Sequence, residues 1–443
     1  MGPAAQGPPA GRDRPAAVVG PTAQALPMSA ARPATAVEAV SGPAVLDTAV
    51  PALRRALAGG PPVLVLPPDP ARAPVSGLLA ADVPLTGRAE SPVVAVVATS
   101  GSTGSPKGVL LTGAALRASG TATHSRLRAA RPHPPPGPPT WLLALPITHV
   151  AGLQVLLRAD LADTEAVCLD LSGGFETGRF TAAAGVCRRA ADAAAGPAYT
   201  SLVPTQLARL LDAGGAAVDA LAGLDAVLLG GAPAPPPLLA RAASAGVRVV
   251  VTYGSSETCG GCVYDGVPLG GVTVDVDVDV GGDSDGRVSL AGSVVFSGYL
   301  GDPAATAAVL HGDRFATSDR GRLLADGRLE VLGRLDSVII SGGEKISPEA
   351  VERVLLAEAG IAEAVVVAVP DAQWGQVIAA VVVAAAGHPA PLLADLRAAV
   401  SAALGRAAAP RRLLVLDELP TLALGKPDRQ ALTALLAAGP TGA

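Results

Sequence analysis

Short apolar runs alternate with longer segments rich in Ala, Leu and Arg from about residue 41 onward. This alternation is typical of α/β layering with a substantial parallel sheet. The predicted strands include Val93–Ala98, Trp141–Leu145, Ala226–Leu229 and Arg248–Thr252, each followed closely by Gly, Pro, Ser or Thr. Ligands gather at the carboxyl ends of strands in open α/β sheets. We therefore expect the chemistry of this chain at these strand ends.

The segment Gly271–Phe296 has a different pattern. Valine alternates with aspartate in Val272–Val280, and a second period-two stretch covers Arg287–Val295. Alternation with a period of two is typical of strands with one buried face. The segment therefore predicts a small β subdomain.

After Gly333 the pattern predicts an α+β domain of its own. The predicted order is strand Val338–Ile340, a helix from Ser347, strands Ala364–Val369 and Val377–Val383, helix Leu392–Leu404 and strand Leu413–Leu416. Ser347, Pro348 and Glu349 favour a helix start, because they combine an N-cap hydroxyl, a first-turn proline and an acid near the positive end of the helix dipole. The predicted fold class is α/β: a large layered N-terminal domain with a small β subdomain, plus a small C-terminal α+β domain.

Composition narrows the functional classes. With 443 residues, of which 50% are apolar and 16% charged, the chain is long enough for more than one domain and can bury a core. A net charge of -5 and a pI near 5.6 give no general attraction for nucleic acid or anionic membranes. The longest apolar run, Val377–Gly387, is shorter than the roughly 20 residues of a membrane span. Four cysteines are too few for a disulfide framework, so a reduced, cytoplasmic setting is expected.

Lysine is rare and has an uneven distribution. Of the 33 basic residues, three are lysines (Lys107, Lys345 and Lys426) and 30 are arginines. Each lysine lies in a Gly-containing loop, where a compact point charge differs from a guanidinium fork. Chance is the alternative explanation.

The segment Thr99–Gly108 follows the predicted strand Val93–Ala98 directly. Its small residues let backbone N–H groups approach a polyphosphate, its hydroxyls add donors and Lys107 supplies a cation. A P-loop requires Gly-Lys-Ser/Thr opening a helix, whereas here Pro106 precedes the lysine and Gly108 follows it. A Ser/Gly-rich surface linker is the alternative. The candidate phosphate-binding residues are Thr99, Ser100, Gly101, Ser102, Thr103, Gly104 and Lys107.

Thr99–Gly108 resembles the signature loop of the adenylate-forming superfamily, which holds acyl-CoA synthetases, luciferases and peptide-synthetase adenylation domains. Six further segments resemble that family's motifs in the expected order: Gly230–Pro233, Tyr253–Thr258, Phe315–Asp319, Gly333–Asp336, Ser341–Ile346 and Pro420–Arg429. The resemblance covers roughly residues 90 to 430. It implies an ATP-dependent, Mg²⁺-requiring ligase that forms an acyl-adenylate and then transfers the acyl group to coenzyme A.

The resemblance also assigns the nucleotide site. The Tyr253 ring is expected to stack on adenine, while Glu257 and the Thr258 hydroxyl face Mg²⁺ and the α-phosphate. Asp319 is suited to accept both ribose hydroxyls, and Arg334 is expected to donate to the same sugar. The alternatives are a core tyrosine beside a solvated acid, and a turn aspartate. The remaining residues expected to bind nucleotide or CoA are Gly231, Ala232, Pro233, Gly254, Gly343 and Lys345.

Lys426 is the expected catalytic residue. Adenylation moves negative charge onto the α-phosphate and the departing pyrophosphate, so an ammonium delivered by a mobile second domain can stabilise that transition state. Asp336 lies where the family has its hinge, with an ordinary linker acid as the alternative. Rotation there would exchange Lys426 for the Gly342–Lys345 loop. The Pro- and Ala-rich composition of residues 1–40 predicts a disordered tail. The other predicted domains are 41–333 (N-terminal, binding ATP and acid), 334–336 (hinge) and 337–443 (C-terminal).

Three stretches resemble the o-succinylbenzoate–CoA ligase branch of menaquinone biosynthesis: Leu145–Leu153, Ser201–Leu207 and Cys259–Leu269. Such a pocket needs a slot for an aryl ring and polar partners for a second carboxylate. The candidates are His149, Thr205, Gln206, Ser255 and Ser256. His149 is expected to gate the reacting carboxylate, with a core histidine as the alternative. Because the chain has ten aromatic residues, aliphatic and glycine walls would form the slot.

Several alternatives remain open at this point. Cys259 and Cys262 have zinc or redox spacing but lack partner ligands, so we expect them to line a cleft after Glu257. Pro427 stiffens the loop that carries Lys426. The functional alternatives are a ligase for another aryl or acyl acid, a carrier-loading adenylation domain and a non-catalytic nucleotide-binding homologue. The carrier-loading alternative is weakened, because no Ser-bearing carrier module lies in the 14 residues that follow Arg429. The sequence is compatible with a homodimer and does not set the oligomeric state.

Overall fold

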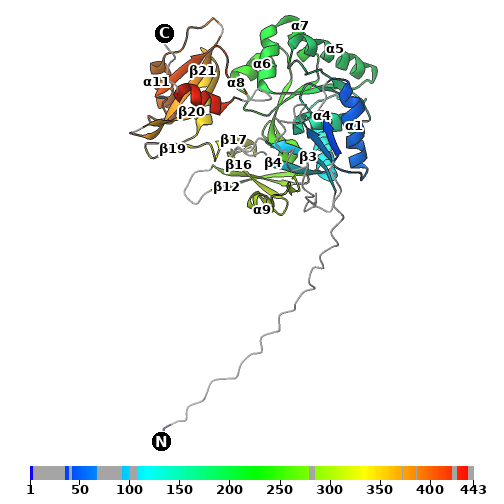
Figure 1. Cartoon of the computed structure of the whole chain (residues 1–443), viewed down its shortest axis with the longest axis horizontal. Coiled ribbons are helices and arrows are strands. Elements are labelled where there is room, and N and C mark those ends of the chain that lie inside the picture. Colours follow the sequence, from blue (N-terminus) through cyan, green and yellow to red (C-terminus); the bar gives the residue numbers. More distant parts are fainter. Residues whose placement is uncertain are drawn as a thin grey trace. The chain divides into compact units, whose positions relative to one another are not determined.

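The computed structural model describes residues 1–2, 35–38, 42–66, 92–99, 107–278, 285–371, 373–385, 387–421 and 427–437. The first sheet has the order β1-β2-β3-β4-β14. Its strands are β1 Thr35–Glu38, β2 Val63–Leu66, β3 Val93–Thr99, β4 Lys107–Thr112 and β14 Gly298–Tyr299. β1, β2 and β3 run parallel, while β4 returns antiparallel to β3. Helix α1 Ala44–Leu57 packs against β1, β2 and β3 (Figure 1).

The second sheet has the order β11-β10-β9-β8-β7-β5-β6, and its five strands from β9 to β6 are parallel. The strands are β5 Thr140–Leu143, β6 Val167–Cys168, β7 Ala198–Leu202, β8 Ala226–Leu229, β9 Val249–Ser255, β10 Gly260–Tyr264 and β11 Val267–Pro268. The neighbouring helices are α3 Gly113–Ala129, α4 Val150–Leu161, α5 Thr177–Ala193, α6 Pro204–Ala213, α7 Gly215–Ala222 and α8 Pro236–Ser244, with the 3₁₀ turn η2 at Ser256–Thr258.

Alternation along β5 shows how this sheet buries both faces. Trp141 and Leu143 belong to the core shared with α1, α3 and α4, whereas Leu142 belongs to the core beneath α5, α6 and α7. Successive side chains of a strand point to opposite faces, so a strand covered on both sides is apolar throughout. Trp141 and Leu142 are fully buried.

A third, antiparallel sheet contains β12-β13-β16-β15, with β17 paired to β16. The elements are β12 Val272–Val278, β13 Gly286–Gly292, α9 Pro303–Val309, β15 Leu310–His311, β16 Arg314–Leu323 and β17 Leu329–Arg334. Asp302 caps α9 by accepting a hydrogen bond from the Ala305 backbone N–H. The segment predicted to form a small β subdomain, Gly271–Phe296, supplies β12 and β13 of this sheet. The sheet also carries Asp319 on β16 opposite Arg334 on β17.

The C-terminal domain has a sheet in the order β19-β18-β21-β20, with β22 parallel to β21. Its elements are β18 Ile339–Ser341, β19 Glu344–Ile346, α10 Pro348–Leu356, β20 Ile361–Asp371, β21 Gly375–Ala384, α11 Leu393–Leu404, β22 Arg412–Leu416 and α12 Arg429–Ala437. Ser347 caps α10 through the Ala350 backbone N–H, as its sequence predicts. Val366 and Val382 face one core, while Val365 and Val381 face the other.

The predicted strands of the large domain and the predicted elements after Gly333 are confirmed, with shifts of one to three residues at most ends; β19 and α12 were not predicted. The predicted tail to residue 40 is wrong at residues 35–38, because these residues pair with β2; residues 3–34 lie outside the described part. The fold class is confirmed: large N-terminal and small C-terminal domains of mixed α/β structure. Within the described residues, no helix is both long and apolar enough to span a bilayer.

Candidate functional site

A hairpin brings the two ends of the predicted phosphate loop together. Thr99 at the end of β3 pairs with Lys107 at the start of β4, so Thr99 extends the predicted strand Val93–Ala98 and Lys107 begins a strand that was not predicted. Ser100, Gly101, Ser102, Thr103 and Gly104 lie outside the described residues. The ends of this loop are therefore fixed next to each other by the sheet.

Lys107 and Glu257 meet at Tyr299. The Lys107 ammonium lies 4.8 Å from the centre of the Tyr299 ring, and the Tyr299 hydroxyl donates a 2.9 Å hydrogen bond to Glu257 Oε1. Glu257 comes from η2 and Tyr299 from β14. The structure therefore gathers the expected phosphate-binding and metal-binding residues around one phenol.

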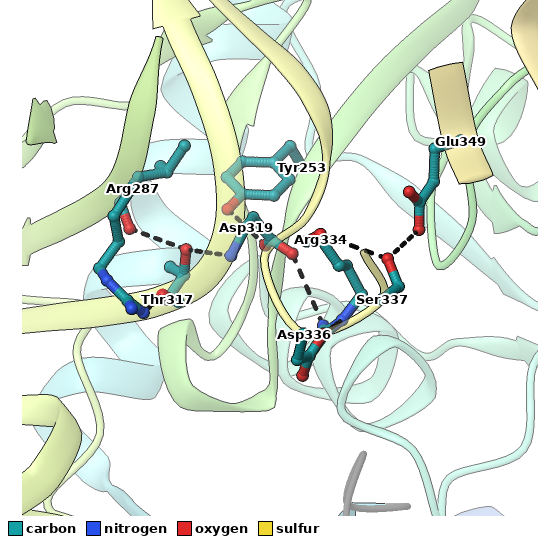
Figure 2. Close-up of polar contacts among 9 residues, drawn as sticks. Tyr253, Arg287, Thr317, Asp319, Arg334, Asp336, Ser337 and Glu349 are labelled. Carbon is teal, nitrogen blue, oxygen red and sulfur yellow. Dashed lines mark hydrogen bonds and ion pairs between the residues drawn. The ribbon is translucent and has the colours of Figure 1, made fainter. Parts of the chain in front are cut away.

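Tyr253 and Asp319 are joined directly. The Tyr253 hydroxyl donates a 2.7 Å hydrogen bond to Asp319 Oδ2, and Arg334 approaches Asp319 Oδ1 at 3.5 Å (Figure 2). Burial raises the pKa of Asp319, opposed by the tyrosine hydrogen bond and the arginine charge. Burial also raises the pKa of Tyr253, so its hydroxyl remains a donor. The residues expected at adenine and ribose thus form one group.

Arg334 is shared between Asp319 and the expected hinge. Its guanidinium makes two 2.7 Å hydrogen bonds to Asp336, and these raise the pKa of Arg334. The Ser337 hydroxyl donates to Glu349 (Figure 2). Glu349 also accepts a 3.0 Å hydrogen bond from Ser347. The segment next to Asp336 is therefore tied to the first turn of α10.

The turn after β9 orients Glu257. Thr258 is fully buried, accepts a hydrogen bond from the Ser255 backbone N–H and donates to the Gly260 carbonyl. Its hydroxyl stabilises the turn and does not face outward, contrary to the predicted contact with Mg²⁺ and the α-phosphate. Gly254 is required here, because a Cβ would lie 2.2 Å from the Gly260 oxygen. Ser256 is half-buried in the same turn.

The loop Gly230–Pro233 lies beside this turn. A Cβ on Gly230 would lie 2.4 Å from Thr252 Oγ1, next to Tyr253 in the chain. Gly231 has a φ of +83° and is exposed, Ala232 is half-buried and Pro233 is exposed. The carboxyl ends of β8 and β9 thus bring the predicted Gly231, Ala232 and Pro233 to the edge of the sheet that carries Tyr253.

The predicted acid-binding residues divide into two groups. Gln206 is buried, accepts a hydrogen bond from the Val203 backbone N–H and donates one to the Ala144 carbonyl, so it caps α6 and cannot serve as a free pocket ligand. That prediction is corrected. His149 is half-buried and precedes α4, and Thr205 is half-buried in the first turn of α6. Among the described residues, nothing hydrogen-bonds the buried Ser255 hydroxyl.

Sequence reasoning missed a buried polar cluster made of Gln154, Arg158, Tyr264 and His124. Arg158 is 3% exposed, contacts the Tyr264 hydroxyl at 3.4 Å and has no carboxylate partner within the described structure. Both amide atoms of Gln154, which is 0% exposed, and the Arg158 Nε have no described hydrogen-bond partner. A signal was present: Gln154 and Arg158 are four residues apart in an otherwise apolar helix, which puts them on one face.

This cluster lies under the Glu257 turn. Ser119 on α3 donates a 3.2 Å hydrogen bond to the Cys259 carbonyl, and a Cβ on Gly260 would lie 3.7 Å from Gln154 Cγ. Buried polar atoms without partners cost free energy unless a ligand or water satisfies them. Buried polar atoms without described hydrogen-bond partners, some of them on the positively charged Arg158, therefore lie next to η2.

The second-domain residues are only partly described. Gly343 has a φ of +88°, and Lys345 is exposed on β19. Lys426 lies outside the described residues; around it, Thr421 pairs with Pro427 and the Asp428 backbone N–H donates to the Pro420 carbonyl. In the described ranges, no group of three or more His, Cys, Asp or Glu side chains could hold a metal ion. Cys259 and Cys262 are free and buried, and burial raises the pKa of each thiol.

Two family models and several relatives match this chain. The chain matches the family model of the AMP-binding enzyme at residues 30–300 and that of the AMP-binding enzyme C-terminal domain at residues 350–426. It is 44% identical over 344 residues to the "Probable 2-succinylbenzoate–CoA ligase" of Mycobacterium tuberculosis, covering 77% of this chain and 84% of that one. The 2-succinylbenzoate–CoA ligase of Enterococcus faecalis is 31% identical over 75% of this chain and 68% of its own length.

A solved structure has the same architecture. It is the o-succinylbenzoate CoA synthetase from Bacillus subtilis in complex with the acyl-adenylate intermediate OSB-AMP. The TM-score is 0.67 at 25% identity, covering 91% of this chain and 88% of that one.

Proposed function

Because this chain belongs to the AMP-binding enzyme family, we propose that it is an ATP-dependent acid–CoA ligase acting on 2-succinylbenzoate, in menaquinone biosynthesis. The acid carboxylate would attack the α-phosphorus of ATP and release pyrophosphate. The CoA thiolate would then attack the acyl carbonyl and release AMP. The names of the relatives at 44% and 31% identity support this choice.

The main structural support for 2-succinylbenzoate as the acid is the buried side chain of Arg158. The guanidinium of Arg158 is fully desolvated and has no carboxylate partner among the described residues. Burying such a charge costs free energy unless a ligand supplies the opposite charge. A diacid such as 2-succinylbenzoate has a second carboxylate that must not be buried unpaired. Gln154 adds an amide N–H pair beside the same turn. A simple monoacid would leave this charge uncompensated.

ATP would occupy the edge where Tyr253, Asp319 and the hairpin of Lys107 lie. Tyr253 would offer its ring to adenine, Asp319 would accept from the ribose and Lys107 would contact a phosphate. In the described structure the hydroxyl of Tyr253 already orients Asp319. The ligand would therefore bind groups that are held in place beforehand, which lowers the entropic cost of binding.

Magnesium fits this site as a partner of the phosphates. Mg²⁺ usually keeps several waters and is bound by one or two carboxylates plus substrate phosphates. Glu257 is such a single carboxylate, and its orientation is fixed by Tyr299. When bound, the ion would neutralise charge on the phosphate oxygens. Glu257 would hold it, and Lys107 would complement it.

The second half of the proposal concerns domain movement. We assign residues 41–333 and 337–443 to the two domains, with Asp336 in a hinge at 334–336. Lys426 would stabilise the adenylation transition state, and Gly343 and Lys345 would face the CoA channel after rotation. Arg334 supports a coupled hinge, because it contacts both Asp319 and Asp336. A cytoplasmic location is proposed from the substrates ATP and CoA and from the free cysteines.

A substrate panel tests the function. The purified chain would be given ATP, Mg²⁺ and CoA with 2-succinylbenzoate, benzoate or succinate, and both pyrophosphate and the CoA thioester would be measured. Turnover with 2-succinylbenzoate and not with the monoacid benzoate is the expected result. Turnover with other acids alone would select a different ligase, and ATP binding without turnover of any acid would select a non-catalytic homologue.

A further inference from the structure

Tyr299 contacts both polar groups that would face the phosphates. Its hydroxyl donates to Glu257 Oε1 at 2.9 Å, and the Lys107 ammonium lies 4.8 Å from its ring centre. The residue is 8% exposed. Since a cation over an aromatic face is attracted by the ring quadrupole, one side chain interacts with both charges in different ways.

The backbone around Tyr299 connects the same two motifs. The Phe296 N–H donates a 2.8 Å hydrogen bond to the Glu257 carbonyl, and the Leu300 N–H donates one of the same length to the Gly108 carbonyl, next to Lys107. Between them, Tyr299 pairs with Val109 of β4. This short segment is therefore anchored to the Glu257 turn at one end and to the Lys107 strand at the other.

A packing role alone does not account for the hydroxyl. The Tyr299 ring meets Phe296 edge-on at 5.0 Å, and a phenylalanine would preserve that contact. The hydroxyl, however, is aimed at a carboxylate, and hydrogen bonds to charged groups are stronger than neutral ones.

We propose that Tyr299 is a positioning residue for MgATP: its hydroxyl fixes the orientation of Glu257 and its ring fixes Lys107, so that the two groups keep a constant separation. The proposal rests on the proposed function only in that ATP is the nucleotide. It does not depend on which acid is activated. Partners that orient metal-ligating side chains commonly change metal affinity about 10–100-fold when removed.

Direct binding of ATP to the full chain, measured by calorimetry across a Mg²⁺ series, tests this role without any acid. Y299F removes the hydroxyl and keeps the ring; the Mg²⁺ concentration for half-maximal ATP binding should rise about tenfold. Y299L removes both contacts and should also weaken ATP binding at saturating Mg²⁺. Y199F is the matched control, since Tyr199 is a buried tyrosine of β7 in the core, and it should bind as wild type does.

A double-mutant cycle separates positioning from general packing. If the hydroxyl acts through Glu257, Y299F combined with E257Q should need no more Mg²⁺ than E257Q alone, because contacting residues that act in one chain are non-additive. Unchanged Mg²⁺ dependence in Y299F, or full additivity with E257Q, would overturn the proposal. Wild-type protein that binds MgATP but does not activate 2-succinylbenzoate would refute the proposed acid and leave the role of Tyr299 standing.

Discussion

The hydroxyl of Tyr253 lies 2.7 Å from the carboxylate of Asp319, although 66 residues separate them in the chain. Tyr253 lies on β9, the last parallel strand of the second sheet, and Asp319 lies on β16 of the third sheet. The contact therefore joins two sheets at the point where a nucleoside would bind. It also sets the relative position of the ring and the acid before any ligand arrives.

Replacing Tyr253 with phenylalanine tests this preorganisation. The variant keeps an aromatic ring for adenine and loses the hydrogen bond that holds Asp319. We expect the Kd for ATP to rise about tenfold, because one hydrogen bond to a charged group contributes about 1.5 kcal/mol. Calorimetric titration with ATP measures the change. Equal affinity in the wild type and Y253F would show that Asp319 is positioned without the phenol.

Nucleoside binding should weaken in mild acid. Burial raises the pKa of Asp319, so the carboxylate takes up its proton at a higher pH than an exposed aspartate does. A protonated acid accepts fewer hydrogen bonds from ribose, so the Kd should rise as the pH falls toward that raised pKa. Adenosine is the suitable probe because it has no phosphate to titrate. D319N should bind more weakly and without this acid limb; an identical limb in D319N would assign the effect to another group.

Local sequence patterns predicted the strands and helix caps, because these features depend on interactions between residues that are near in sequence. The strand Ala226–Leu229 and the Ser347 cap lie where the sequence predicts them. Both features depend on residues that are close together in the sequence. The assignment of Gln206 to the pocket was wrong for a related reason: Pro204 and Gln206 occupy the positions of a helix start, and that local signal was the one to follow.

Long-range contacts could not be predicted in the same way. Tyr299 and Glu257 are 42 residues apart, and Arg158 and Tyr264 are 106 apart, so no periodicity connects them. Only the tertiary fold shows that Arg158 is buried without a carboxylate partner in the described part of the chain. The sequence motifs therefore predicted the residues of the nucleotide site. The buried positive charge of Arg158, which we propose for binding the acid, was found only in the structure.

R158M should separate stability from substrate binding. A buried charge with no carboxylate partner among the described residues destabilises the free enzyme, so an apolar side chain of similar length should leave the free energy of unfolding unchanged or raise it. The KM for 2-succinylbenzoate should rise about 10–100-fold, as expected for losing a charged hydrogen bond, with the KM for ATP unchanged. Urea unfolding and steady-state kinetics check the two effects. A strong loss of stability with an unaltered KM would make Arg158 a purely structural residue.

His124 should make the fold acid-sensitive. Trp141 donates a 3.2 Å hydrogen bond to His124 Nε2, and burial together with the Arg158 charge lowers the pKa of His124 to about 4 from 6.5. The folded state then binds fewer protons than the unfolded state between these values. The free energy of unfolding should fall as the pH drops through this window, by on the order of 3 kcal/mol in total.

H124Q keeps an acceptor for Trp141 and does not titrate. Urea unfolding between pH 7 and pH 4 should therefore show a flatter acid dependence in H124Q than in the wild type. R158M provides a second check, because removing the nearby positive charge should bring the pKa of His124 closer to its usual value. A pH dependence that is the same in all three proteins would contradict this origin.

Removing the Lys426 side chain should impair the first half-reaction, adenylation, and spare the second, thioester formation. Its ammonium is proposed to stabilise charge that develops during adenylation, so K426A should lose pyrophosphate release by a factor of about 100 or more. Thioester formation from supplied acyl-adenylate and CoA should remain close to wild type. The fold should persist, since Arg429 and the buried Glu352 anchor the following helix through a 2.7 Å ion pair. R429A is the matched comparison: it leaves Glu352 unpaired and should lower stability, near the lower end of about 3–5 kcal/mol because Arg429 is partly exposed. Equal loss of both half-reactions in a folded K426A would refute the assignment of Lys426 to adenylation.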